Sequence, residues 1–198
     1  MKEMFAYKFL VASCGFFYRV FRPAKVHGSE NIPQEGGFVL VANHQHWLDP
    51  VHIAAHLPQR QYHYMAKAET FCNGFMKWLL GPTGVGAIPV NRGQSDLNAI
   101  RMSMKVIADG HALAIFPQGH RSRDNSPTPF LNGASMIAMR AGAPIIPVFL
   151  DGPYRLLRRA DVYVGKPIDI SDLGRKFDAD TLNEITRRME SAVWSMKQ

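Results

Sequence analysis

Two histidines and an aspartate lie close together in the stretch VANHQHWLDP, residues 41–50. A carboxylate beside an imidazole fixes the ring tautomer and stabilises the imidazolium that forms when the histidine accepts a proton. The other ring nitrogen is then free to act as a general base near neutral pH. His44 and Asp49 are therefore candidates for a proton-transfer pair.

The same stretch permits two other interpretations. With His46 and His52, the pair forms H-x-H-x-x-D-x-x-H, one residue off the H-x-H-x-D-H spacing of metallo-β-lactamase-like hydrolases. Asp49 followed by Pro50 is also a strong helix-start signal, with Asp49 as N-cap and Pro50 at the first helical position. The spacing slip and the need for Asp49 as a cap count against a metal, and we predict none. Taken alone, the stretch would also fit a helix cap preceded by loop histidines.

The elements that must position these residues follow from hydrophobic patterning. Strands are predicted at 38–42, 62–66, 85–90, 112–116, 145–150 and 162–164. Helices are predicted at 50–57, 70–80, 96–108, 133–141 and 179–196. In the helix over 96–108, Ser95 is the expected cap and the predicted apolar face is made by Leu97, Ile100, Met104, Ile107 and Ala108. This alternation predicts an α/β fold with a mostly parallel central sheet flanked by helices.

Active sites of such sheets lie in loops beyond the carboxyl ends of the strands. NHQHWLD follows the first predicted strand and PQGHRSR follows the fourth. On a straight helix, five positions would separate His44 from Asp49 by about 140°. With His44 on a loop, the chain can curl so that the Asp49 carboxylate reaches its ring.

The N-terminus predicts an amphipathic membrane-interface helix, because residues 4–21 are mostly apolar with a narrow basic stripe. The stripe consists of Lys8, Ala12, Gly15, Arg19 and Arg22. The segment is too interrupted for a transmembrane span, and a helix packed on the domain is the alternative. We divide the chain into this segment, 1–22, and a single α/β domain, 23–198, that opens with a linker over 23–37.

Composition and charge limit the kind of partner. The 198 residues are 46% hydrophobic and 20% charged, which favours a folded globular protein. Lys and Arg number 23 against 16 Asp and Glu, and the net charge of +7 favours an anionic partner. Arg155, Arg158 and Arg159 form a basic cluster without a nucleic-acid recognition motif, so acidic lipid headgroups or an acidic carrier protein are the expected partners. Cys14 and Cys72 match no disulfide or metal spacing, which favours a reducing compartment.

Several blocks in order resemble one known family. NHQHWLD (43–49) resembles the Asn-His-x4-Asp block of the glycerolipid acyltransferases, the 1-acylglycerol-3-phosphate (lysophosphatidate) acyltransferase family. AKAETF (66–71) is similar to its Ala-Lys-x-Glu segment, GAIPVNR (86–92) to Gly-x-Ile-x-x-x-Arg, and FPQGHRS (116–122) to Phe-Pro-Glu-Gly-Thr-Arg-Ser. FLNGASMIAMRAGAPIIPV (130–148) resembles the segment that ends in the Pro-containing fourth block. The similarity covers most of the predicted domain.

The resemblance implies an O-acyltransferase in which His44 removes the proton of a lysolipid hydroxyl, Asp49 orients His44, and the hydroxyl attacks an acyl thioester. The most direct reaction converts 1-acylglycerol-3-phosphate to phosphatidate. The resemblance assigns acceptor binding to these residues: Lys67, Arg92, Gln118, Gly119, His120, Arg121 and Ser122. No bound cofactor is expected, since the thioester of acyl carrier protein or coenzyme A is a co-substrate. The implied location is the cytoplasmic face of the cell membrane, as a peripheral or monotopic protein on an anionic surface, with no nucleic-acid partner.

Two positions depart from the family pattern, namely Gln118 where glutamate is usual and His120 where threonine is usual. Gln118 can replace glutamate if that residue acts through hydrogen bonds, but not if its charge matters. The departures leave other acceptors open, such as a lyso-ornithine lipid. They also leave open a non-catalytic lipid- or carrier-binding relative, and a hydrolase that passes the acyl group to water is a further alternative.

Overall fold

A single mostly parallel sheet forms the centre of the protein. The computed structural model describes residues 5–81, 85–91, 96–122, 124–174 and 177–197, with side chains from Ser13 onward. Within these residues the strands are ordered β1-β7-β6-β2-β5-β3-β4, and every neighbouring pair is parallel except β6 and β7. Their bounds are β1 (Val26–His27), β2 (Phe38–Ala42), β3 (Tyr62–Lys67), β4 (Ile88–Val90), β5 (Ala112–Ile115), β6 (Ile145–Leu150) and β7 (Val162–Val164). The predicted fold class is confirmed.

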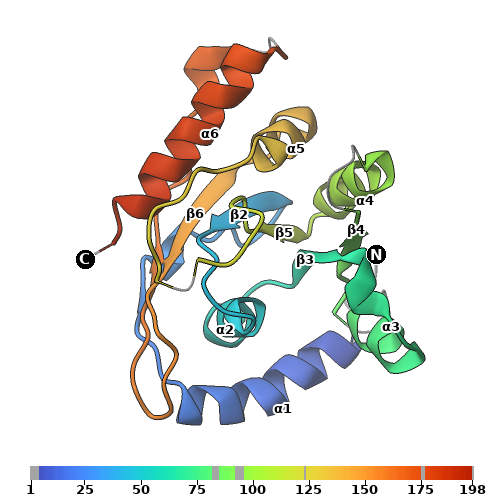
Figure 1. Cartoon of the computed structure of the whole chain (residues 1–198), viewed down its shortest axis with the longest axis vertical. Helices are drawn as coiled ribbons and strands as arrows, with labels where there is room; N and C mark the ends of the chain where they lie inside the picture. The colour runs from blue at the N-terminus through green and yellow to red at the C-terminus, as the bar shows by residue number, and fades with distance from the viewer. Residues whose placement is uncertain (1–4, 82–84, 92–95, 123, 175–176, 198) are drawn as a thin grey trace.

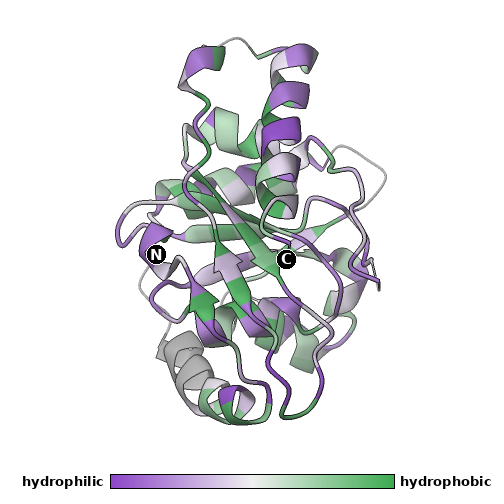
Figure 2. Ribbon diagram, turned by 90° about the vertical axis from the view of Figure 1, so that its left-hand side faces the viewer, coloured by the Kyte–Doolittle hydropathy of each residue, from purple (hydrophilic) through white to green (hydrophobic). Residues whose placement is uncertain are grey.

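Helices cover both faces of this sheet. Their bounds are α1 (Phe5–Phe21), α2 (Asp49–His56), α3 (Gly74–Leu80), α4 (Leu97–Ala108), α5 (Gly133–Ala141) and α6 (Ala179–Trp194), with short 3₁₀ turns η1 (Ser29–Asn31), η2 (Ala68–Phe71) and η3 (Ser171–Leu173). Figure 1 shows α4, α5 and α6 on one side of the sheet and α2 on the other, with α1 outside α2. The side view in Figure 2 shows the apolar strands between these two helical layers.

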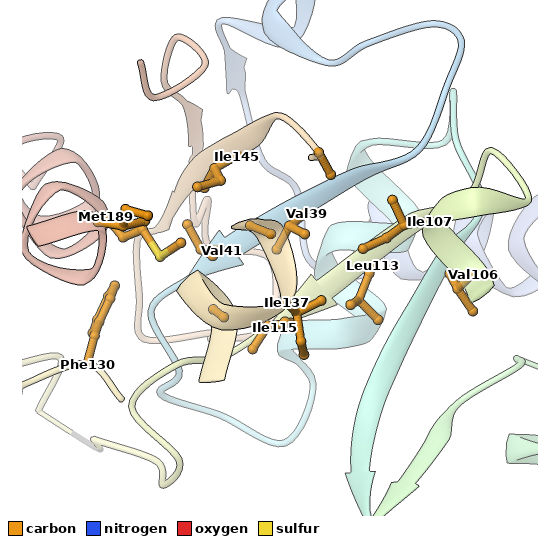
Figure 3. Packing of buried hydrophobic residues seen from close by; sticks show 14 of the residues in the cluster. Val39, Val41, Val106, Ile107, Leu113, Ile115, Phe130, Ile137, Ile145 and Met189 are labelled. Atoms are coloured by element: carbon orange, nitrogen blue, oxygen red, sulfur yellow. The ribbon is translucent and has the colours of Figure 1, made fainter. Parts of the chain in front are cut away.

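The core is divided by the sheet because side chains alternate along each strand. Val39 and Val41 of β2 lie on the side of α5 and α6, in a cluster with Ile137 and Met189 (Figure 3). The intervening Leu40 faces the opposite cluster, which contains Ile53 of α2. Every residue of β2 and of β6 is buried. These two strands are thus held from both faces, as is usual for central parallel strands.

Three segments differ from the predicted ones by more than two residues or in the number of elements. The predicted linker over 23–37 contains β1, which pairs with β7, and the turn η1. The helix predicted over 70–80 is divided into η2 and α3, because the Asn73 side chain accepts the Met76 N–H at 2.9 Å and starts a new helix. The strand predicted over 85–90 begins only at Ile88.

Helix α1 packs on the domain through the stripe that was predicted to be basic. Arg19 Nη1 donates to the Ala55 carbonyl at 2.7 Å, and Gly15 is buried beside Ala55. The opposite side exposes aromatic rings, with Phe17 62% and Phe21 50% exposed. Among the described residues, none of the helices is long and apolar enough to span a bilayer. The helix therefore contacts α2 and presents an apolar face to its surroundings.

Candidate active site

The loops that follow β2 and β5 meet because these strands are parallel neighbours in the sheet. Residues 43–48 leave the carboxyl end of β2, and residues 116–132 leave that of β5. Strand β6 borders β2 on its other side, so the chain after Leu150 reaches the same edge. The two polar motifs of the sequence are thus brought together where parallel sheets usually place a ligand.

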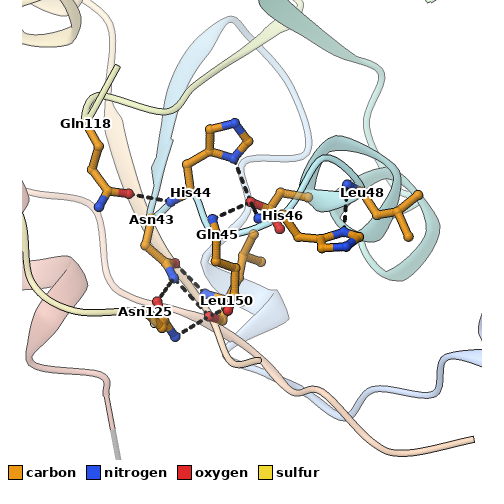
Figure 4. A network of polar contacts seen from close by, with 9 residues as sticks. Asn43, His44, Gln45, His46, Leu48, Gln118, Asn125 and Leu150 are labelled. Atoms are coloured by element: carbon orange, nitrogen blue, oxygen red, sulfur yellow. Dashed lines mark hydrogen bonds and ion pairs between the residues drawn. The ribbon is translucent and has the colours of Figure 1, made fainter. Parts of the chain in front are cut away.

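His44, in the loop over residues 43–48 (the dyad loop), and Asp49, the first residue of α2, form a close pair (the dyad). The His44 Nδ1 lies 2.6 Å from the Asp49 Oδ2, which also accepts the N–H groups of Gln45 at 2.8 Å and His46 at 3.0 Å (Figure 4). The Asp49 side chain is fully buried, whereas that of His44 is 17% exposed. Because the carboxylate accepts the Nδ1 proton, the neutral ring has its lone pair on Nε2. No hydrogen bond between described residues uses this Nε2.

The predicted capping role of Asp49 is wrong in detail. Leu48 holds the cap position without a side-chain hydrogen bond, and Asp49 and Pro50 are the first two residues of α2. The Asp49 carboxylate instead turns back to the preceding loop, where it binds two backbone N–H groups and the His44 ring. Asp49 therefore shapes this loop as well as contacting the candidate base.

The segment after β5 holds the backbone of His44. The His44 N–H donates to the Gln118 Oε1, and the His44 carbonyl accepts the Ser122 N–H at 2.8 Å. The His44 ring stacks on Phe116, with ring centres 4.3 Å apart. Gln118 and Ser122, which the sequence assigned to substrate binding, thus contact the candidate base directly.

Gln118 uses both ends of its amide in this arrangement. Its side chain is buried, its Oε1 accepts from His44, and its Nε2 donates to the Thr128 Oγ1. A glutamate here could accept from His44 equally well, but the Thr128 hydroxyl would then have to turn and donate. The departure from the family glutamate therefore preserves the contact with His44.

Two further residues of the first motif, Asn43 and Gln45, were missed as site residues. Asn43 is buried; its Nδ2 donates to the Leu150 carbonyl at 2.9 Å, and its Oδ1 accepts the Leu150 N–H at 2.7 Å. The Gln45 Nε2 donates to the same carbonyl at 3.0 Å. Figure 4 shows these amides directed to Leu150 while the His44 ring points away from them. The signal was present in the sequence, since two amide side chains flank a histidine directly after a buried strand.

The remaining histidines do not assemble the ligand set that was considered for a metal. The His46 Nδ1 accepts a backbone N–H at 3.2 Å, and burial lowers the pKa of His46. The His52 Nε2 donates to the Ala160 carbonyl at 2.9 Å, and its Nδ1 accepts from the Tyr18 hydroxyl at 3.2 Å. Burial, reinforced by His56, lowers the pKa of His52 to about 4. Both ring nitrogens of His52 are occupied, and among the described residues no group of three or more His, Cys, Asp or Glu is arranged so that it could hold a metal ion.

The predicted acceptor-binding residues are only partly brought together. His120 and Arg121 are exposed on the loop after β5, and the charge of Arg121 contributes to lowering the pKa of His46. Gly119 before them has a φ of 72°, and a Cβ there would lie 2.9 Å from Leu131 Cδ1, so the turn favours glycine.

The other two predicted basic residues do not join this cluster. Lys67 ends β3, with its Nζ 3.4 Å from the Glu69 Oε2, and β5 separates β3 from β2. Arg92 lies outside the described residues.

The fold and the site define an α/β protein with a His–carboxylate pair at the carboxyl edge of its sheet. The sequence model of the Acyltransferase family matches residues 23–151, which include both members of the pair. The chain therefore belongs to the Acyltransferase family.

Similar proteins agree with this membership. A 1-acyl-sn-glycerol-3-phosphate acyltransferase of Streptococcus pneumoniae is 32% identical over 175 residues, covering 85% of this chain and 64% of that protein. A protein of the same name from Bacillus subtilis is 27% identical, covering 94% of each chain. The crystal structure of the acyltransferase PlsC from Thermotoga maritima shares the fold, with a TM-score of 0.74 and 24% identity over 96% of this chain and 79% of that one.

Proposed function

We propose that this protein transfers a fatty acyl group from a thioester to the free hydroxyl of a lysophospholipid, with 1-acylglycerol-3-phosphate as acceptor and phosphatidate as product. The observation that carries the proposal is the 2.6 Å contact between His44 Nδ1 and the buried Asp49 carboxylate. The names of the streptococcal and Bacillus relatives support the choice of acceptor.

The chemistry follows from the free Nε2 of His44. Nε2 takes the proton of the acceptor hydroxyl while the hydroxyl oxygen attacks the thioester carbonyl. The tetrahedral intermediate collapses as the carbon–sulfur bond breaks, and the proton passes from the imidazolium to the leaving thiolate. Asp49 stabilises the imidazolium between these two transfers. The products are an ester and a free thiol, from either acyl carrier protein or coenzyme A, and no bound cofactor takes part.

Basic residues supply the acceptor's phosphate site in this proposal. Arg121 is exposed beside the dyad loop, and a guanidinium can bind a phosphate through two parallel hydrogen bonds. Lys67 and Arg92 belong to the same proposed set, with Lys67 the more distant because β5 lies between its strand and β2. Gly119, whose positive φ shapes this turn, and the exposed His120 precede Arg121 in the proposed substrate site.

An anionic membrane is the proposed source of the lysolipid. Phe17 and Phe21 of α1 are exposed, and α1 ends beside the loop between β6 and β7, where the Leu157 N–H donates to the Phe21 carbonyl at 2.7 Å. In Figure 1 this loop runs alongside the end of α1. Leu156 and Leu157 are 65% and 67% exposed in that loop, next to the basic cluster predicted from the sequence. Apolar side chains bordered by arginines suit peripheral contact with acidic headgroups, which we assign to the cytoplasmic face.

A donor and acceptor panel tests this function. Purified protein is given lysophosphatidate or a phosphate-free lysolipid, including lyso-ornithine lipid, with acyl carrier protein or coenzyme A thioesters, and products are identified by mass spectrometry. We expect phosphatidate and free thiol in equal amounts. Fatty acid released without acceptor would indicate a hydrolase, transfer only to a phosphate-free lipid would change the acceptor, and lipid binding without any product would indicate a non-catalytic relative.

A further inference from the structure

Only one of the two Asp49 carboxylate oxygens takes part in the contact with His44. Its Oδ2 receives the His44 ring and two backbone N–H groups, but its Oδ1 is buried and makes no hydrogen bond that meets ordinary geometric criteria with any described residue. Buried carboxylate oxygens normally have a donor. The hydroxyl of Tyr154 is likewise buried and has no such hydrogen bond with a described residue.

Tyr154 is held against the dyad loop from several sides. Its ring lies 4.5 Å from that of His52 and packs edge-on to that of His46, with 5.5 Å between centroids. Arg22, the residue that follows α1, donates from its Nη1 to the Tyr154 carbonyl at 2.6 Å. The Tyr154 ring is thus enclosed between the dyad loop and α2, while its backbone carbonyl is bound by Arg22, just after α1.

The charge of Asp49 acts on this phenol. Burial raises the pKa of Tyr154 well above its ordinary value, and the Asp49 carboxylate raises it further. The phenol is therefore protonated at neutral pH and can only donate to a carboxylate. The other titratable or charged groups around the pair are His44 and His46 of the loop, His52 of α2, Tyr18 of α1, and Arg22 just after α1.

We propose that Tyr154 is a positioning residue of the acyl transfer, whose hydroxyl donates to the Asp49 Oδ1 and thereby holds the Oδ2 toward His44. This inference rests on the proposed function for its consequence, but not for the contact itself. It gives both buried orphan atoms a partner. The hydrogen bond from Tyr154 also reduces the negative charge on the Asp49 carboxylate. The carboxylate therefore attracts the His44 imidazolium less strongly than it would without this donor.

Replacing Tyr154 by phenylalanine tests the role, because the ring packing remains and only the hydroxyl is lost. We expect kcat to fall roughly tenfold or more, as for the loss of a hydrogen bond to a charged group, with the KM of both substrates unchanged. The acid limb of the pH–rate profile should move to higher pH, because the freed carboxylate holds the imidazolium more tightly.

The matched control is Tyr64→Phe. The Tyr64 hydroxyl donates to the Pro50 carbonyl in the same helix as Asp49, at 2.8 Å. Removing the Tyr64 hydroxyl tests whether a general loosening of α2 would have the same effect. We expect the acid limb of the pH–rate profile to stay in place in this variant. Thermal unfolding of both variants verifies that folded proteins are compared.

Two measurements decide the inference independently of turnover. Nuclear magnetic resonance of ring-labelled histidine follows the titration of His44, whose midpoint should rise in Tyr154→Phe and not in Tyr64→Phe. In a double-mutant cycle with Asp49→Asn, the Tyr154 substitution should add little to the loss of kcat. An unmoved His44 titration, or full additivity in the cycle, would overturn the positioning role. Absence of acyl transfer by the wild type with the His44 shift intact would overturn the proposed function alone.

Discussion

Replacing Gln118 by methionine keeps the side-chain length and removes both of its hydrogen bonds. The His44 N–H then loses its acceptor at a position where Gln118 is 2% exposed. A buried donor without a partner costs about 1–3 kcal/mol, whereas the half-buried Thr128 hydroxyl can rebind water. We therefore expect the free energy of unfolding to fall by about 1–3 kcal/mol. For a chain of this size, Tm should drop by roughly 2–12 °C.

The same substitution should reduce catalysis because the His44 backbone is no longer fixed. A misplacement of about 1 Å can cost about 100-fold in rate, so we expect kcat to fall while the KM for the acceptor changes little. Unfolding by urea and steady-state acyl transfer measure the two effects. Gln34→Met is the control, since Gln34 is exposed and its Nε2 donates to the Ile32 carbonyl at 3.1 Å; it should change stability by less than about 0.5 kcal/mol. A Gln118→Met variant with wild-type Tm and kcat would refute the positioning of His44 by this amide.

Three other outcomes are expected. Arg121→Ala should raise the KM for lysophosphatidate by roughly 10–150-fold without changing that for the thioester, with Arg121→Lys recovering only part; a rise confined to the donor KM would move Arg121 to the thioester side. Burial lowers the pKa of His52 from 6.5 to about 4 in the folded protein, so the unfolded chain binds more protons between these pH values. The contribution of neutral His52 to the free energy of unfolding, up to about 3 kcal/mol, is present above pH 6.5 and is lost as pH falls toward 4. Urea unfolding at these two pH values should show a weaker pH dependence for His52→Gln than for the wild type. An equal pH dependence would contradict the assignment. The double variant Phe17→Ser, Leu156→Ser should bind anionic vesicles at least about tenfold more weakly than the wild type. The control Leu97→Ser, which replaces an exposed leucine of α4, should bind like the wild type. Equal binding by the double variant, the control and the wild type would exclude Phe17 and Leu156 from the membrane contact.

The fold could be predicted from the sequence largely because its strands are short, apolar and buried on both faces. The bounds of β2, β6, β7 and α5 match the predicted ones. Strand β1 has only two residues, Val26 and His27, and depends on pairing with β7 rather than on a pattern of its own. Such an element has no signal that sequence periodicity can detect.

The buried face of α4 shows a second limit. Leu97 and Ala108 were predicted to face the core, but both are exposed. The helix instead buries Ser103, whose hydroxyl donates to the Ala99 carbonyl at 2.8 Å. A serine that bonds within its own helix can be buried. Apolar counting therefore placed the two ends of the face wrongly, while Ile107 is buried as predicted and Ile100 and Met104 are half-buried. The predicted cap Ser95 lies outside the described residues, and the Asp96 side chain accepts the Ala99 N–H at 3.0 Å.

The site was predictable to the extent that one motif contains it. His44 and Asp49 are close in sequence and come together where one loop enters α2. The contribution of Tyr154 depends on how the loop after β6 returns to α2, and its distance of more than 100 residues from Asp49 gives no local signal. Likewise, the family resemblance assigned Gln118 to substrate. Its contact with the His44 backbone has no sequence signal, because it requires the parallel pairing of β2 and β5.

His44→Ala is the most direct test of the proton-transfer pair. Single-turnover acyl transfer from a thioester to lysophosphatidate, measured by mass spectrometry with a variant whose circular dichroism and Tm match the wild type, isolates the chemical step. Loss of the general base should lower the rate by about 10²–10⁴-fold, and His46→Ala should have a much smaller effect because the His46 Nδ1 serves only a backbone N–H. A folded His44→Ala variant that transfers the acyl group at close to the wild-type rate would contradict the role assigned to His44 and Asp49.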